Sequence, residues 1–314
     1  MNVLRSLVST PAPTVAIEIA SDRVTVVSLG RGGPGAVVTA HATEALAPRA
    51  VVPAVNEKNV QEPAVVTAAL ERALERLGRR PRRAALVVPD AVAKVSIIRF
   101  DEVPARAHDL DELVRWQVRK TAPFRIEDAQ VAYTPGVVDP GGAADFVVAL
   151  TRRSIVEEYE QICQAAGVHA GLVDLSSFNL VNTIVAGSSV SGDWLLVHIA
   201  LESSTIVIVR GEHLILFRNR PTAGIGQLAD LVHQTAMYYE DRLGGTGFER
   251  VYLVGAAAGT TDAVRHDLEE RLEATVDAVD PRHLVVLDDR IVASPELLDH
   301  LAAPIGVLMR ERAS

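Results

Sequence analysis

The chain has 314 residues and a net charge of −9, and 48% of its residues are apolar while only 4% are aromatic. At roughly 150 residues per domain, this length corresponds to about two domains whose cores must be built from Val, Leu, Ile and Ala. The acidic balance argues against general nucleic-acid binding, and the single cysteine, Cys163, excludes a disulfide framework within the chain. No apolar run of about 20 residues occurs, and the first residues lack the continuous apolar segment of a signal peptide. We therefore expect a cytoplasmic protein whose contact with any membrane is peripheral.

The first half of the chain alternates between strand patterns and helix patterns. Runs rich in β-branched residues, bounded by glycine, proline or polar residues, predict strands at 15–19, 24–29, 36–43, 84–88, 94–100, 130–136, 145–150 and 168–173. Apolar residues at helical spacing predict helices at 64–77, 110–121, 154–166 and 176–186. The polar, proline-containing segment 48–63 is expected to form a loop.

The opening pattern returns in the second half. Strands are expected at 194–200, 205–210, 212–218, 251–254 and 284–287, and helices at 227–243, 262–272 and, in part, 295–309. In both halves a short turn, after Glu18 and after His198, leads through small or polar residues into a β-branched strand and later a helix. Two β-β-β-α halves predict one bilobal α/β protein with a central cleft.

The two turns have a composition that suits phosphate binding. A strand-turn-strand of small residues exposes successive backbone N–H groups, and two such turns could hold the phosphates of a nucleotide from both sides. Oxygen ligands would also be needed to organise Mg²⁺, and Glu18 is the candidate metal ligand. At the two turns the candidate nucleotide-binding residues are Glu18, Ser21, Thr25, His198, Ser203, Ser204 and Thr205.

Three segments together resemble the phosphate-1, phosphate-2 and adenosine motifs of the actin, sugar-kinase and Hsp70 superfamily. They are the hairpins that follow Glu18 and His198, and the strand and small-residue turn at 251–259. The resemblance of the third segment implies that Gly255 and Ala256 also contact the nucleotide. Within that superfamily the chain resembles the PilM family of type IV pilus assembly proteins. This closer resemblance lies in segments 84–90, 113–117, 172–182 and 233–239.

The resemblance implies a bilobal actin-like (ribonuclease-H-like) fold with an inserted strand-helix-strand-strand-helix subdomain, as in PilM and the division protein FtsA. By this analogy residues 14–83 form part of the first lobe and 84–172 the inserted subdomain. Residues 173–192 form a linking helix, and 193–314 the second lobe.

The chain departs from the family pattern at all three motifs. Glu18 stands where the family has Asp, and His198-Ile199-Ala200 stands where it has Asp-Ile-Gly. Imidazole is a poor ligand for Mg²⁺, and the methyl group of Ala200 narrows the approach of a phosphate. Alanines lie between Gly255 and Gly259, where the family has further glycine. These changes predict weak or lost hydrolysis of ATP, while binding of ATP and Mg²⁺ without turnover is left open.

The resemblance implies a function in assembly rather than in metabolism. We expect a scaffold of the type IV pilus inner-membrane complex, attached peripherally to that membrane through a partner. The expected partners are a short cytoplasmic peptide of a PilN-like membrane protein, the pilus motor ATPase and further copies of the chain. The expected walls of the peptide groove are Val87, Val88, Val95 and Ile97. The alternatives are an active actin-like ATPase or kinase, and a type II secretion component similar to GspL.

Overall fold

The computed structural model describes residues 12–32, 35–78, 80–187, 192–221, 225–255 and 261–313. Its largest sheet has the strand order β14-β3-β2-β1-β4-β8, in which β1, β2 and β3 are antiparallel and the other pairs are parallel. The strands are β1 (Val15–Ile19), β2 (Arg23–Gly32), β3 (Gly35–Ala45), β4 (Arg83–Val88), β8 (His169–Leu175) and β14 (Val285–Leu287). Every residue of β1 is buried, because this central strand is covered on both faces.

A second sheet repeats the arrangement of the first. Its order is β11-β10-β9-β12-β13, and β9 has an antiparallel neighbour, β10, and a parallel neighbour, β12, as β1 has β2 and β4. The strands are β9 (Asp193–Ile199), β10 (Ser203–Arg210), β11 (His213–Pro221), β12 (Arg250–Val254) and β13 (Val276–Ala278). The short strand β13 has no counterpart among the strands expected from the sequence. The matching topology explains why the strand pattern of the sequence repeats.

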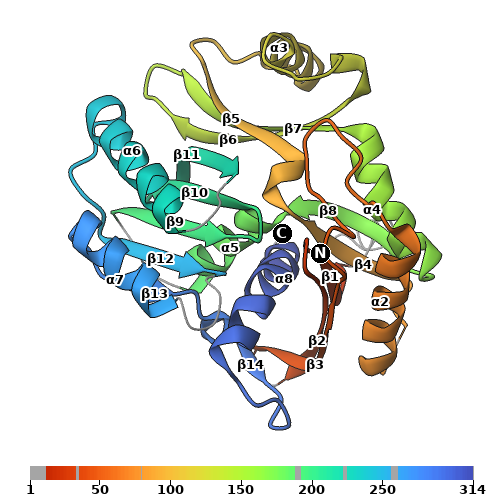
Figure 1. The fold of residues 1–314 in the computed structure, drawn as a ribbon. Coiled ribbons are helices and arrows are strands. Elements are labelled where there is room, and N and C mark those ends of the chain that lie inside the picture. The colour runs from red at the N-terminus through yellow and green to blue at the C-terminus, as the bar shows by residue number, and fades with distance from the viewer. Residues whose placement is uncertain are drawn as a thin grey trace.

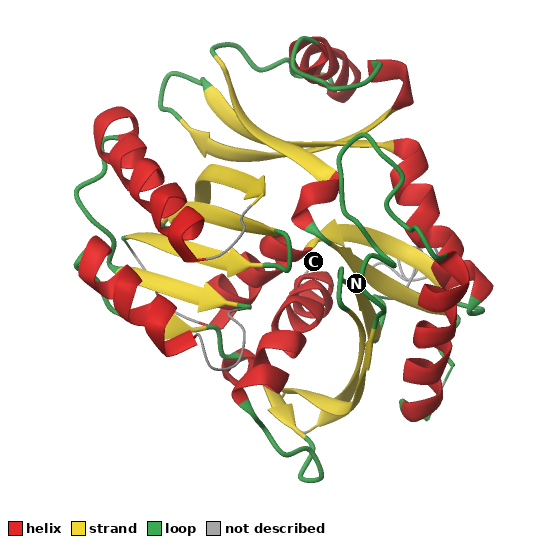
Figure 2. Cartoon of the chain, in the orientation of Figure 1, coloured by secondary structure: helices red, strands yellow, loops and turns green. Residues whose placement is uncertain are grey.

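Helices cover both sheets and fill the space between them (Figures 1 and 2). The outer face of the first sheet carries α2 (Pro63–Arg76) and α4 (Arg153–Ala165), and that of the second carries α6 (Ile225–Leu243) and α7 (Thr261–Leu272). Two further helices, α5 (Ser176–Gly187) and α8 (Pro295–Ala313), lie between the sheets and share one apolar core with both. Gly306 permits this crossing, because a Cβ atom there would lie 2.0 Å from the carbonyl oxygen of Asn179.

A third, smaller sheet stands apart from the other two (Figure 1). Its antiparallel order is β5-β7-β6, formed by β5 (Ala93–Phe100), β6 (Ala129–Val138) and β7 (Ala144–Arg152). Helix α3 (Ala107–Arg119) covers one face of this sheet with a separate apolar core. A single 3-10 turn, η1 (Asp90–Val92), connects β4 to β5.

The structure divides two segments that the sequence analysis treated as single units. Of the segment 84–172, β4 and β8 pair with each other in the first sheet and α4 packs beside α2, so the separate sheet comprises residues 93–152. Within 193–314, β14 returns to pair with β3, and α8 packs against β1, β2 and β4. The two ends of segment 84–172, namely β4 and α4 with β8, therefore belong to the first lobe in space. The end of segment 193–314, namely β14 and α8, belongs to the first lobe as well.

No helix in the described parts of the chain is long and apolar enough to cross a bilayer.

Candidate functional site

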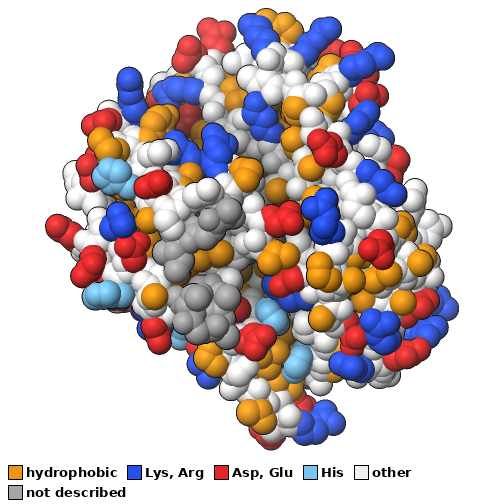
Figure 3. All heavy atoms as spheres, in the orientation of Figure 1, with side chains coloured by type: hydrophobic (Ala, Val, Ile, Leu, Met, Phe, Trp, Pro, Cys, Tyr) orange, Lys and Arg blue, Asp and Glu red, His pale blue; other side chains and the backbone are white. Residues whose placement is uncertain are grey.

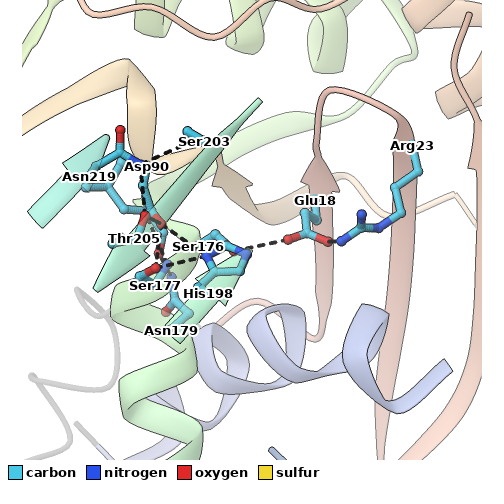
Figure 4. Close-up of polar contacts among 11 residues, drawn as sticks. Glu18, Arg23, Asp90, Ser176, Ser177, Asn179, His198, Ser203, Thr205 and Asn219 are labelled. Atoms are coloured by element: carbon cyan, nitrogen blue, oxygen red, sulfur yellow. Dashed lines mark hydrogen bonds and ion pairs between the residues drawn. The ribbon is translucent and has the colours of Figure 1, made fainter. Parts of the chain in front are cut away.

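The candidate site lies between the two large sheets, at the ends of β1, β4 and β9. Glu18 is near the end of β1, His198 is near the end of β9, and Asp90 follows β4 directly. The first residues of α5, Ser176 and Ser177, stand between them (Figure 4). In open α/β sheets the crevice outside the carboxyl ends of the strands is the usual place for a ligand. The site therefore has the location expected for a nucleotide cleft.

Asp90 is the centre of a hydrogen-bond network that the sequence analysis did not find. Its Oδ1 accepts a hydrogen bond from the Ser177 N–H at 2.9 Å, and its Oδ2 accepts from the hydroxyls of Ser177 and of Thr205, the latter at 2.7 Å. Nδ1 of His198 lies 3.2 Å from the same Oδ2. Asn219 in turn donates to Oγ1 of Thr205 at 2.9 Å. This network links the end of β4 with α5 and with β9, β10 and β11 of the second sheet (Figure 4).

The carboxylate of Asp90 is held in its charged form by these neighbours. The side chain is only 2% exposed. Burial by itself raises the pKa of Asp90, but the hydrogen bonds from His198 and Ser177 and the charge of His198 outweigh it, so this pKa lies below its ordinary value. The sequence signal that could have identified the residue is its place: it is an acid immediately after a continuously buried strand, in Val87-Val88-Pro89-Asp90.

The combination of Asp90, His198 and Ser177 does not have the geometry of a nucleophilic triad. In such a triad the serine and the aspartate contact opposite nitrogens of the imidazole. Here Ser177 Oγ lies 3.0 Å and Asp90 Oδ2 lies 3.2 Å from the same nitrogen, Nδ1 of His198. The arrangement links the two lobes and cannot relay a proton from the serine through the ring to the aspartate.

Glu18, the candidate metal ligand, already has a cationic partner. Nη2 of Arg23 lies 3.3 Å from its Oε2, and the hydroxyl of Ser176 donates to its Oε1 at 3.3 Å. Burial by itself lowers the pKa of Arg23, but the carboxylates of Glu18 and Asp22 outweigh it, so the guanidinium stays charged. Among the described residues, no group of three or more His, Cys, Asp and Glu side chains could hold a metal ion. Glu18 and Asp90, whose carboxylate oxygens are the type of ligand that Mg²⁺ prefers, both already accept contacts from protein donors.

The structure separates the remaining predicted nucleotide-binding residues into different environments. Thr25 is fully buried inside the first sheet, where its hydroxyl lies 3.3 Å from that of Thr43 on β3, so it faces a neighbouring strand and not the cleft. Ser21 and Ser204 are buried, and Ser203 accepts a hydrogen bond from Asn219 at 3.4 Å. Ala256 lies outside the described residues. Of the predicted set, Glu18, His198 and Thr205 are brought to the cleft as side chains.

Gly255 closes the cleft from the side of β12. Its φ of 83° favours glycine, and a Cβ atom there would lie 2.1 Å from the carbonyl oxygen of Ile199. Its N–H donates to Oδ2 of Asp299 on α8 at 3.1 Å. Burial raises the pKa of Asp299. Gly255, at the end of β12, is thus tied to α8 by a carboxylate of the chain itself.

The predicted walls of the peptide groove do not all face solvent. Val87 is completely buried and Val88 is 4% exposed, because β4 lies inside the first sheet and its two faces contribute to two different apolar cores. These two residues cannot line an open groove, and the expectation for them is wrong. Val95 is partly buried against the first core, and Ile97 lines a cavity of about 520 Å³ between the three-stranded sheet and the second lobe.

Comparison with known proteins is consistent with this architecture. Among solved structures, a chain of a PilM-PilN type IV pilus biogenesis complex matches with a TM-score of 0.84 and 18% identity, over 96% of this chain and 99% of that one. A Bacteroides thetaiotaomicron protein with an actin-like ATPase fold and unknown function matches with a TM-score of 0.51 and 10% identity, over 96% and 99%. No curated protein matches the sequence. These likenesses confirm the expected actin-like fold. Residues 16–242, more than half of the chain, match the family described as type IV pilus assembly protein PilM, and the chain belongs to that family.

Proposed function

We propose that this chain is a scaffold of a type IV pilus inner-membrane complex that does not hydrolyse nucleotide and that binds a short cytoplasmic peptide of a PilN-like membrane protein. The observation that carries the first part is the occupied cleft. Asp90 accepts four contacts, and Glu18 is paired with Arg23.

The protein contacts of Glu18 and Asp90 engage the carboxylates that would otherwise hold a metal ion for phosphoryl transfer. Such transfer depends on metal ions that neutralise the phosphates and on a group that orients the attacking oxygen. In this chain Arg23 pairs with Glu18, and Asp90 accepts hydrogen bonds from Ser177 and Thr205. A metal could bind there only after these protein contacts had broken, and breaking a buried ion pair typically costs about 3–5 kcal/mol. The contacts of Asp90 with Thr205 and His198 join the two lobes through side chains of the chain itself.

A thermal unfolding measurement with and without millimolar Mg-ATP tests this part of the proposal. A ligand at about 100 times its dissociation constant stabilises a protein by about 2.7 kcal/mol, which is a shift of roughly 4 °C for a chain of this length. We expect no shift, and no phosphate release above that of a heat-treated sample. Phosphate release above that of the heat-treated sample would contradict the proposal. A clear shift that EDTA abolishes, without such release, would show that the chain binds Mg-ATP without turnover and would make Glu18 the residue to replace next.

The peptide-binding part is supported by membership of the PilM family and by the similarity to a chain of a PilM-PilN complex. Val95 and Ile97, on β5, are the proposed contacts. The probe is the labelled cytoplasmic peptide of the PilN-like protein from the same genome, measured by fluorescence anisotropy. We expect Ile97→Asp to weaken binding at least tenfold, whereas Val286→Asp, a control at an exposed position of β14, leaves it unchanged. Absence of binding to the wild-type chain would refute this part.

The same role would bring the chain into contact with the pilus motor ATPase and with further copies of itself at the inner membrane. Co-sedimentation of the chain with the purified motor, and sedimentation equilibrium of the chain alone, measure these two contacts separately. A scaffold should show at least the first of them, and a chain that remains a free monomer in both experiments would argue against the role.

A further inference from the structure

Helix α3 lies at the outer end of the molecule, beyond the three-stranded sheet (Figure 1). Val114 and Val118 of this helix are buried in the small apolar core under it. Trp116 lies two positions from each of them, roughly 200° around the helix, and it is 57% exposed. The helix therefore turns an apolar face to the sheet and a large aromatic side chain to the solvent.

Basic side chains gather around Trp116. The segment 113–126 contains four basic residues and no acid, in a chain whose net charge is −9. Lys94 of β5 reaches the same segment, because its Nζ donates to the carbonyl oxygen of Thr121 at 2.7 Å. Figure 3 shows basic and hydrophobic side chains together at this end of the molecule. We use the name α3 surface for Trp116 and the basic residues around it, which are Lys94, Arg115, Arg119, Lys120 and Arg125.

Part of this positive charge has no acidic partner within the chain. Arg119 and Lys120 are exposed, and no carboxylate of the described residues lies within ion-pair distance of either. Arg115 and Arg125 each have an acidic partner. Nζ of Lys120 lies 4.8 Å from the centre of the Trp116 ring, so a cation and an aromatic ring form one continuous exposed surface.

The helix dipole accounts for only part of this arrangement. Basic residues in the last turn of a helix offset the partial negative charge there, and Arg119 lies in that turn. The dipole gives no reason for an exposed tryptophan three residues earlier, nor for Lys94, which comes from another element. Tryptophan together with Lys and Arg is typical of surfaces that lie at the interface between water and an anionic bilayer. The combination therefore indicates a lipid surface as the occupant.

We propose that the α3 surface binds directly to an anionic lipid bilayer. Trp116 enters the head-group region, and the basic side chains around it contact lipid phosphates. Each basic residue near an anionic surface strengthens binding about fivefold, so the contact is weak and reversible. The proposed function brings the chain to the membrane through a partner, whereas this contact needs no partner and determines which end of the chain faces the bilayer.

Co-sedimentation of the full chain with vesicles tests this inference. The vesicles contain either phosphatidylcholine alone or equal parts of phosphatidylcholine and phosphatidylglycerol. We expect binding only to the second kind, and its loss at high salt, because salt screens exposed charges. Arg119→Gln combined with Lys120→Gln should weaken binding about 25-fold. The matched control, Arg80→Gln with Arg82→Gln, removes the same charge from the basic segment 79–83 and should leave binding unchanged.

The two tryptophans of the chain provide a second measurement. Trp194 is 1% exposed in the core between the sheets, so a change in emission on addition of vesicles reports on Trp116. We expect the emission to move to shorter wavelength with anionic vesicles, and vesicles with brominated acyl chains to quench it. Trp116→Gln should abolish both responses.

The inference is wrong if the two kinds of vesicle bind the chain equally, if the two double variants lose the same affinity, or if vesicle binding leaves the emission unchanged. An emission shift that follows the protein concentration without vesicles would show that a second copy of the chain covers the α3 surface instead. The vesicles contain no protein, so failure of vesicle binding with intact binding of the PilN-like peptide refutes only this inference. Vesicle binding without peptide binding refutes only the proposed function.

Discussion

Replacement of Asp90 by Ala should destabilise the protein more than any other change to a single cleft residue. It leaves the buried N–H of Ser177 without its acceptor, and it removes the shared partner of Thr205 and His198. Removing one side of a buried hydrogen-bonded charge pair typically costs about 3–5 kcal/mol. An unfolding entropy of about 2.1 cal/mol/K per residue gives roughly 0.66 kcal/mol/K for 314 residues. The expected decrease in Tm is therefore about 5–8 °C.

Thermal unfolding followed by circular dichroism measures this decrease. The matched control is Asp241→Ala, on the exposed face of α6, which should change Tm by less than about 1 °C. Thr205→Val removes one member of the network without changing its shape, and its effect should nearly disappear when Asp90 is already Ala, because both residues belong to one network. If Asp90→Ala were no more destabilising than Asp241→Ala, the network would not hold the lobes together.

The same carboxylate gives the stability a pH dependence of known sign. The pKa of Asp90 lies below its ordinary value of 3.8 in the folded chain, so the folded state binds this proton less readily than the unfolded state. Its contribution is present above pH 3.8 and is lost as the pH falls through the lowered folded value. The difference in unfolding free energy between wild type and Asp90→Ala, measured by urea titration, should therefore be smaller at pH 3 than at pH 7. An unchanged difference would refute the assignment of charge to this network.

Three further predictions concern the buried residues Gly306 and Cys163 and the contact between Asp299 and Gly255. Gly306→Val should lower Tm by more than about 3 °C because its Cβ would meet a backbone carbonyl of α5, whereas Gly226→Ala, with open space around it on α6, should not. Burial raises the pKa of Cys163 to about 12, so a thiol reagent at pH 8 should react only after urea is added. Burial raises the pKa of Asp299, so its charge opposes folding at neutral pH. Asp299→Asn should therefore raise Tm at pH 7, and this gain should fade in scans at lower pH if the carbonyl still accepts from Gly255.

Elements with a clear local pattern were predictable because their neighbours along the chain define them. The buried run at 15–19 and the helical spacing at 64–77 correspond to β1 and α2 within one residue at each end. β13 was missed because its sequence, Val276-Asp277-Ala278, has one β-branched residue and an acid, whereas the equally short β14 is a continuous apolar run. The helix expected at 295–309 continues to Ala313 despite Pro304, because α8 is held between the two sheets.

The sequence by itself determined the class of fold and the family, because a repeated order of strands and helices, and motifs in a fixed order, are properties of the chain alone. Only the tertiary structure decided what occupies the cleft. Asp90 meets Ser177, His198 and Thr205 from positions 87, 108 and 115 residues away, and no local pattern records such contacts. It also decided that Val87 is a core residue, because an apolar strand looks the same in sequence whether its faces are covered or open.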